Sequence, residues 1–197
     1  MRGVVHQAMV VAAMSVGFSF ASHGGEPTLP QLSEEAIFAL TSLEGVPTPA
    51  QLEALIPNAL DTLRSHAKFP GGDQTKIRLR AIRAISLWPP SAENQLTLKM
   101  VLAEGLTQNT GTSVLLAQAA IESLGRQAGA EDTELVKAVS DSLTHSSRDV
   151  RFAAARALRQ IGATSALDAL RARQYDEDVP AVRLAITEAI QALNQSR

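Results

Sequence analysis

The sequence predicts an all-α protein built as a solenoid of stacked helix pairs. A twelve-residue pattern of helical periodicity occurs four times along the chain, at Ile77–Trp88, Ser113–Leu124, Val150–Ile161 and Val182–Leu193. The copies start 36, 37 and 32 residues apart, a spacing typical of helical repeat proteins. Alanine and leucine dominate the composition and aromatic residues make up only 4% of it, a bias that favours helices over strands.

The first predicted element is a short helix that precedes the repeats. Ser33 has the side chain of an N-cap, and Glu34 and Glu35 follow in the first turn, where the helix dipole favours carboxylates. We expect this helix to run to about Glu44 and to end at Gly45.

The next predicted helix opens the first pair with a capping box. Thr48 can cap the helix, Pro49 suits its first position, and Gln51 can return a hydrogen bond to the cap. Pro57 interrupts the apolar stripe that follows, and predicts either a kink or the true start of the helix. The segment Pro70–Asp73 is expected to form a loop.

The rest of the chain keeps a two-helix rhythm. Each later copy of the pattern is preceded by another helical segment, near Ser91–Leu106, Glu131–Leu143 and Ser165–Tyr175. Gly125 and Gly162 follow the second and third copies, where C-terminal caps are expected. The chain is therefore expected to hold about four helix pairs and one leading helix, nine helices in all.

The columns of the repeated pattern have distinct physical roles. Its eighth position is alanine in every copy, at Ala84, Ala120, Ala157 and Ala189. Its third, ninth and twelfth positions hold large apolar residues, which we expect to fill the space between helices. The alanine column should let neighbouring helices approach closely. A single pair cannot bury such a stripe, so the pairs must stack.

The pattern resembles the second helix of HEAT repeats. Its consensus is V-R-x-x-A-x-x-A-L-x-x-I/L, followed by glycine in two copies. The 32-residue spacing of the last two copies also resembles the shorter HEAT-like repeats first described in phycobilisome lyases. The resemblance spans about Pro49–Leu193 and implies a right-handed α-solenoid of about four HEAT-like helix pairs plus the leading helix. It brings no catalytic motif with it.

The N-terminal segment has the order of a secretory signal peptide. Arg2 precedes an apolar run from Ala8 to Phe20, and Ser19 and Ala21 supply the small residues of a cleavage site. The run is short for a membrane span, which needs roughly 20 residues. An uncleaved anchor and a wrongly assigned start are the alternatives.

The domain organisation follows from this signal. We expect residues 1–21 to be the signal peptide, 22–32 a flexible leader and 33–197 the repeat domain of an exported protein, periplasmic or secreted, with no membrane span after cleavage. The chain has no cysteine and hence no disulfides, so its stability must come from repeat stacking.

Arginine occupies the second position of the pattern. Arg78, Arg151 and Arg183 stand there, whereas the second copy has Val114. Two interpretations are open. The guanidinium groups either bridge to carboxylates of the neighbouring repeat or form a row that binds a partner.

A groove lined by the repeated helices is the expected binding surface. The first copy is the most basic segment of the chain and a second basic stretch surrounds the third copy. These patches either form a solvated face or recognise an acidic protein or polyanion by charge complementarity. The candidate partner-binding residues are Arg78, Arg80, Arg151, Arg156 and Arg183.

Other function classes find little support in the sequence. The net charge of −2 argues against a protein that tracks phosphates, and no nucleic-acid partner is expected. The histidines are scattered without metal-ligand spacing, so no metal, cofactor or catalytic residue is predicted. Trp88 is expected to pack in the core, and Tyr175 is a candidate contact residue.

The sequence thus favours a non-catalytic exported binding module or scaffold, which would recognise a protein or peptide along the concave face of the solenoid. One alternative is an accessory structural subunit of a cell-envelope complex, with contacts made by the ends of the solenoid. Another is a lyase or hydrolase on a HEAT-like scaffold whose site the motifs do not reveal.

Overall fold

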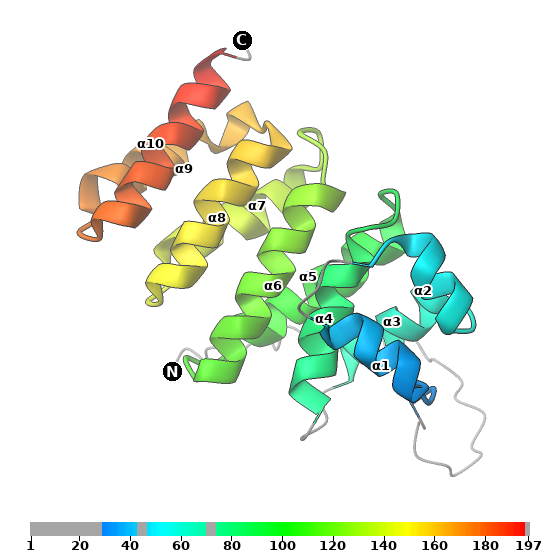
Figure 1. Ribbon diagram of the computed structural model, residues 1–197. Helices are drawn as coiled ribbons and strands as arrows, with labels where there is room; N and C mark the ends of the chain where they lie inside the picture. The colour runs from blue at the N-terminus through cyan, green and yellow to red at the C-terminus, as the bar shows by residue number, and fades with distance from the viewer. Residues whose placement is uncertain (1–28, 43–46, 70–73, 196–197) are drawn as a thin grey trace, which may run out of the picture.

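Helix pairs stacked side by side form the body of the molecule (Figure 1). The computed structural model describes residues 29–42, 47–69 and 74–195, and within these ranges the chain forms ten α-helices and no β-strand. The predicted all-α solenoid is therefore confirmed. The expected signal peptide, the helix end at Glu44 and Gly45 and the loop Pro70–Asp73 lie outside the described residues.

The two predicted N-terminal caps are present. The leading helix α1 spans Glu34–Thr41, and Ser33 Oγ accepts a hydrogen bond from the Ala36 N–H at 3.2 Å. Helix α2 spans Pro49–Leu55 and begins with the expected capping box. The Gln51 N–H donates to Thr48 Oγ1 at 3.3 Å, and the Thr48 N–H donates to Gln51 Oε1 at 2.8 Å.

Pro57 separates two helices. Helix α2 ends at Leu55, Asn58 adopts a left-handed conformation with φ +47°, and helix α3 then spans Ala59–Lys68. The predicted first helix of the first pair is thus two helices, because proline cannot donate the hydrogen bond that would continue the helix. This break accounts for ten helices in the described ranges where nine were expected.

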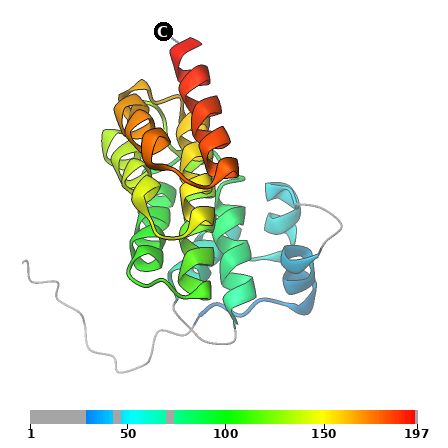
Figure 2. The ribbon, with the colours of Figure 1, turned by 90° about the vertical axis from the view of Figure 1, so that its left-hand side faces the viewer.

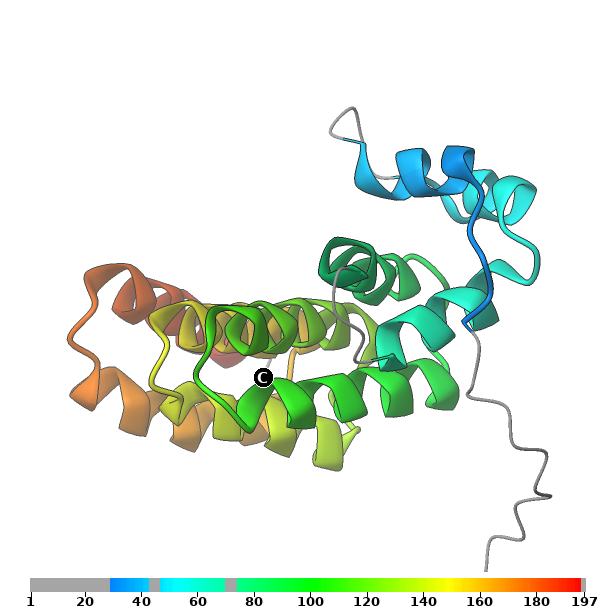
Figure 3. The same ribbon diagram turned by 90° about the horizontal axis from the view of Figure 1, so that it is seen from below.

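The helices form two layers, which Figure 3 shows from below. The layer that carries the repeated pattern consists of the second helices α4 (Thr75–Ile85), α6 (Gly111–Gln127), α8 (Arg148–Ile161) and α10 (Pro180–Gln195). The other layer consists of the first helices α3, α5 (Ala92–Leu106), α7 (Thr133–Asp141) and α9 (Leu167–Asp176). Helix α1 packs against α4, and Figure 2 shows that α1 and α2 project beyond the layer of second helices.

Small residues bring the second helices together. The alanine column is buried in all four copies, with Ala120 and Ala189 at 0% exposure. Gly125 lies within α6, and a Cβ atom added to it would stand 3.2 Å from both Cα and Cβ of Ala157 on α8. The prediction of a cap at Gly125 is therefore wrong, because this glycine serves close helix packing. Gly162 does end α8, with φ +75°.

The large apolar columns divide between core and surface. The ninth and twelfth positions pack in or against the core, as predicted. The third position is mixed, since Leu79 and Phe152 are partly buried and pack against the core, whereas Leu115 and Leu184 are 43% and 60% exposed. The expectation that this column fills the space between helices is therefore wrong for Leu115 and Leu184. They lie on the outer surface of the second-helix layer, because the alanines leave no room between the helices.

The contact between α5 and α6 gives a test of this packing. A Cβ atom at Gly105 would lie 2.5 Å from the Ala117 N atom, whereas one at Gly111 has no atom within 4 Å. Alanine normally stabilises a helix relative to glycine, by roughly 0.5–1 kcal/mol. We expect Gly105→Ala instead to lower the free energy of unfolding by about 1–3 kcal/mol through overpacking. Gly111→Ala is the matched control and should leave it unchanged or slightly higher. Urea unfolding measures both, and a neutral Gly105→Ala would contradict the packing.

Candidate functional site

Arg78 is a structural residue of the solenoid. Its side chain is buried at 6% exposure on α4, and its Nε donates to the Ala67 carbonyl oxygen at 3.0 Å. Its two terminal nitrogens donate to both carboxylate oxygens of Glu104, at the end of α5, at 2.7 and 2.5 Å. These hydrogen bonds lower the pKa of Glu104. The guanidinium group thus joins one repeat to the next.

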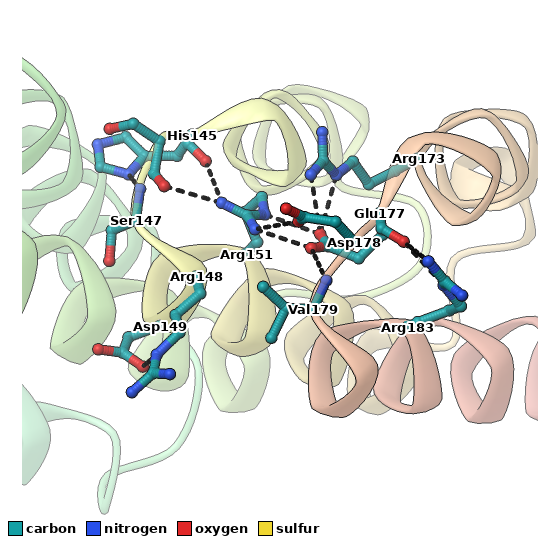
Figure 4. A network of polar contacts seen from close by, with 11 residues as sticks. His145, Ser147, Arg148, Asp149, Arg151, Arg173, Glu177, Asp178, Val179 and Arg183 are labelled. Carbon is teal, nitrogen blue, oxygen red and sulfur yellow. Dashed lines mark hydrogen bonds and ion pairs between the residues drawn. The ribbon is translucent and has the colours of Figure 1, made fainter.

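Arg151 makes the same connection from α8 (Figure 4). Its Nε and Nη2 each donate to the Glu177 carboxylate at 2.8 Å, and its Nη1 donates to the carbonyl oxygens of His145 and Ser146 at 2.9 Å. Glu177 is 1% exposed and follows α9 directly. Arg151 therefore holds the α7–α8 turn and the end of α9 together.

Glu177 is the centre of this network. Besides Arg151 it accepts hydrogen bonds from Arg173 Nε and from the Val179 N–H, each at 3.0 Å. The hydrogen bond from Arg151 is the main cause that lowers the pKa of Glu177 to about 2. The Val179 N–H and Arg173 lower it further, and together they outweigh the opposite effect of burial. Glu177 is therefore an ionised and fully partnered structural group.

Arg183 completes the network from the last helix (Figure 4). Its Nε donates to the Glu177 carbonyl oxygen at 2.7 Å, and its Nη2 donates to the same oxygen. The side chain is exposed, but these bonds direct its guanidinium group to the segment that follows α9. Three of the five candidate arginines are thus engaged within the solenoid. Arg78 and Arg151 bridge to a carboxylate of the neighbouring repeat, whereas Arg183 binds a backbone carbonyl oxygen of its own helix pair.

The copy of the pattern that has Val114 in place of arginine also lacks the glutamate that would pair with it. Both bridging arginines pair with a glutamate 26 residues further along the chain. Twenty-six residues after Val114 stands Ser140, whose hydroxyl donates to the Val136 carbonyl oxygen. The second copy therefore lacks the carboxylate as well as the arginine. This shared spacing is the sequence signal that separates bridging arginines from surface arginines.

The other two candidates, Arg80 and Arg156, line a depression on the second-helix layer. One hollow of about 270 Å³ lies among α1, α4 and α6, and another of about 290 Å³ lies between α6 and α8. The two share Arg83, Glu122 and Arg126, so they form one continuous surface. We call this surface the arginine groove, and its charged residues are Arg80, Arg83, Glu122, Arg126 and Arg156.

Positive charge in the groove exceeds negative charge. Among the residues that the structure describes, four guanidinium groups line it and one carboxylate, that of Glu122, stands among them. Arg83 Nε lies 3.3 Å from Glu122 Oε2, a contact in which both side chains are about 40% exposed. Since solvent screens such an exposed pair, it neutralises little of the charge in the groove.

The remaining guanidinium groups have weak internal partners. Arg126 Nη1 donates to Ser86 Oγ at 3.2 Å, and Arg156 lies 5.7 Å from the centroid of the Phe152 ring. Among the residues that the structure describes, Arg80 has no ion-pair or hydrogen-bond partner for its side chain. These guanidinium groups therefore line hollows that are open to solvent and that an anionic group can enter.

Two groove residues were not among the sequence candidates. Arg83 occupies the same position of the pattern as Arg156, four residues after the third position, and this shared place was the available signal. Arg126 lies beyond the twelve-residue copy, in the part of α6 that continues to Gln127. Its position follows only from the length of that helix.

His66, His145 and Trp88 have local roles. His66 is buried, with Nε2 3.0 Å from the Pro30 carbonyl oxygen, and His145 Nδ1 accepts a hydrogen bond from the Ser147 N–H. Trp88 is partly buried against the core and its Nε1 donates to Glu53 at 3.0 Å. Within the described ranges no His, Asp and Glu cluster could hold a metal ion, and no helix is long and apolar enough to cross a membrane.

Comparison with known proteins agrees with this architecture. A family model described as HEAT repeats matches residues 101–191, from within α5 to near the end of α10. The match contains the Arg151–Glu177 bridge and the α6 and α8 sides of the arginine groove. No curated protein matches the chain.

The buried bridge makes the fold sensitive to acid. Because folding lowers the pKa of Glu177 from 4.5 to about 2, its ionised carboxylate stabilises the folded state above pH 4.5, and this contribution is lost as the pH falls toward 2. We expect Glu177→Gln to lower the free energy of unfolding near neutral pH by about 3 kcal/mol. The variant should also show a weaker pH dependence in that window. The exposed Asp168→Asn is the control and should behave like the wild type. Denaturant unfolding at several pH values measures both, and equal acid sensitivity in Glu177→Gln would count against the assignment.

Proposed function

Because the chain is a HEAT-repeat protein, we propose that it acts as a non-catalytic binding module that holds an acidic segment of a partner protein in the arginine groove. HEAT repeats commonly mediate protein interactions or scaffolding, and their scaffold is typically non-catalytic. The observation that carries the proposal is the excess of four arginines over one glutamate among the described residues that line the arginine groove. Complementary charge on a partner gives specificity and speeds association.

The difference between the buried, paired arginines and the exposed arginines supports this site. Arg78 and Arg151 are 6% exposed and have carboxylate partners, so a ligand could reach them only by breaking the stack. Arg126 and Arg156 are exposed and have no carboxylate within ion-pair distance in the described part of the chain. The binding charge is therefore proposed to lie in the groove and not in the bridging column.

A second candidate function uses the ends of the solenoid. Phe38 on α1 is 67% exposed and Tyr175 on α9 is 90% exposed, and these helices lie at opposite ends of the stack (Figure 1). Exposed aromatic residues are frequent anchors of protein interfaces. They favour an accessory subunit that contacts its complex through its end surfaces.

We also propose that the protein works outside the cytoplasm. The support is the n-region, apolar run and small-residue site of residues 1–21, together with the absence of cysteine, which leaves the chain independent of the redox state of its compartment.

The groove proposal predicts a charge-dependent capture. Arg80→Glu combined with Arg156→Glu should abolish the capture of partner proteins from a cell-envelope extract, as identified by mass spectrometry. Arg148→Glu combined with Arg171→Glu is the control, because it changes the net charge equally at exposed positions outside the groove. Its captured set should match that of the wild type. An unchanged set with the groove variant would refute the groove and favour the end surfaces.

The export proposal predicts a defined N-terminus. The chain expressed with its complete sequence should be recovered from the exported fraction beginning at Ser22, because cleavage follows Ala21. Intact-mass measurement reads this directly. An exported protein that retains Met1 would show that the segment is not a cleaved signal.

A further inference from the structure

The end of the arginine groove next to α1 combines an apolar wall with positive charge. Leu40 at the end of α1 and Ala84 on α4 are 3% and 6% exposed, and Pro47 and Leu87 extend the same wall. Guanidinium groups surround this wall from α4 and α6. We call this hollow the anchor pocket, lined by Leu40, Pro47, Arg80, Arg83, Ala84, Leu87, Glu122 and Arg126.

The anchor pocket is smaller than most small-molecule sites. Its volume of about 270 Å³ lies below the roughly 300–1,000 Å³ typical of small-molecule and cofactor sites. An aliphatic side chain can cover the wall of Leu40, Ala84 and Leu87, whereas a charged group placed against these carbon atoms would lose hydration that they cannot replace. The apolar wall therefore calls for an aliphatic residue of the occupant.

The arginines around the pocket indicate which residues of the bound segment flank its aliphatic residue. Arg80 and Arg83 belong to α4 and Arg126 to α6, so carboxylates on either side of the aliphatic residue would each find a guanidinium group. Glu122 lies between the two hollows, and a continuous chain of phosphates would meet its charge there. A peptide avoids this repulsion, because it can place an uncharged residue opposite Glu122.

The second hollow gives the direction and length of the occupant. Packed helices lie about 8–10 Å apart, and an extended peptide advances about 3.3 Å per residue. A segment that runs from α4 across α6 to α8 therefore reaches Arg156 a few residues after the anchor. The amides of Gln118 and Gln160 line this hollow and can bond to a peptide backbone.

We propose that the anchor pocket binds one aliphatic side chain flanked by carboxylates, so that the partner carries an acidic–aliphatic–acidic motif in an extended segment. This inference rests on the proposed function and adds the chemistry of the ligand to it. The pocket provides the apolar contact, and the arginines of α4, α6 and α8 provide the charge.

The test is a binding titration of the purified full chain with fluorescently labelled synthetic peptides, in which fluorescence anisotropy measures the binding. The probe has the sequence SDDLDDSDS, and its two comparison peptides replace the leucine by serine or every aspartate by asparagine. We expect each comparison peptide to bind about tenfold more weakly than the probe. We expect Leu87→Ser to weaken the probe similarly while leaving the leucine-free peptide unchanged.

Protein controls separate the anchor from general charge effects. Arg80→Glu with Arg156→Glu should abolish binding of the probe, and Arg148→Glu with Arg171→Glu should retain it. Thermal unfolding of each variant checks its fold. The peptide comparison needs no variant, so it tests the anchor even if Leu87→Ser loses stability.

Three outcomes overturn the inference. Equal binding of the leucine-free peptide and the probe, with both lost in the groove variant, removes the anchor and leaves the proposed function intact. If neither acidic peptide binds, the motif is overturned. The proposed function is overturned as well if Arg80→Glu with Arg156→Glu leaves the set of proteins captured from the extract unchanged. Displacement of the probe by dodecanoate, with tighter binding than the peptide, assigns the pocket to an anionic amphiphile.

Discussion

The close approach of the second helices through small residues is the constraint on which the rest of the structure depends. Gly125 of α6 contacts Ala157 of α8, and the alanine column is buried in each copy of the pattern. Interiors are densely packed, so no large side chain fits between helices at this separation. Side chains such as Leu115 and Arg156 therefore point outward and form the face on which the arginine groove lies.

Two classes of arginine follow from this geometry. At the second position of the first and third copies the side chain reaches the next repeat, where Glu104 or Glu177 accepts hydrogen bonds from two nitrogens of the guanidinium group. A buried ion pair adds little net stability over an apolar contact of similar volume, but losing one partner is costly. We infer that these bridges fix how successive repeats are offset. At the seventh position the side chain faces solvent, and Arg83 and Arg156 remain available to a partner.

The sequence predicted the architecture better than the site. Helical periodicity, the Ser33 cap and the Thr48 capping box depend on residues close together in the chain, and each was confirmed. The role of Gly125 was missed, because a glycine after a periodic segment indicates a cap equally well. The groove was only partly predicted. Arg80 and Arg156 were named, but Arg126 joins them through the packing of α6 against its neighbours, which no local pattern encodes.

Site-specific photo-cross-linking in the cells that make the protein tests most directly whether a partner binds in the arginine groove. A benzophenone amino acid would replace Gln160 in the groove, Lys137 on the first-helix layer or Tyr175 at the end of the stack, all exposed positions. We expect a partner to be cross-linked through position 160 and not through 137 or 175. Cross-links confined to position 175 or 137, with none from 160, would contradict it.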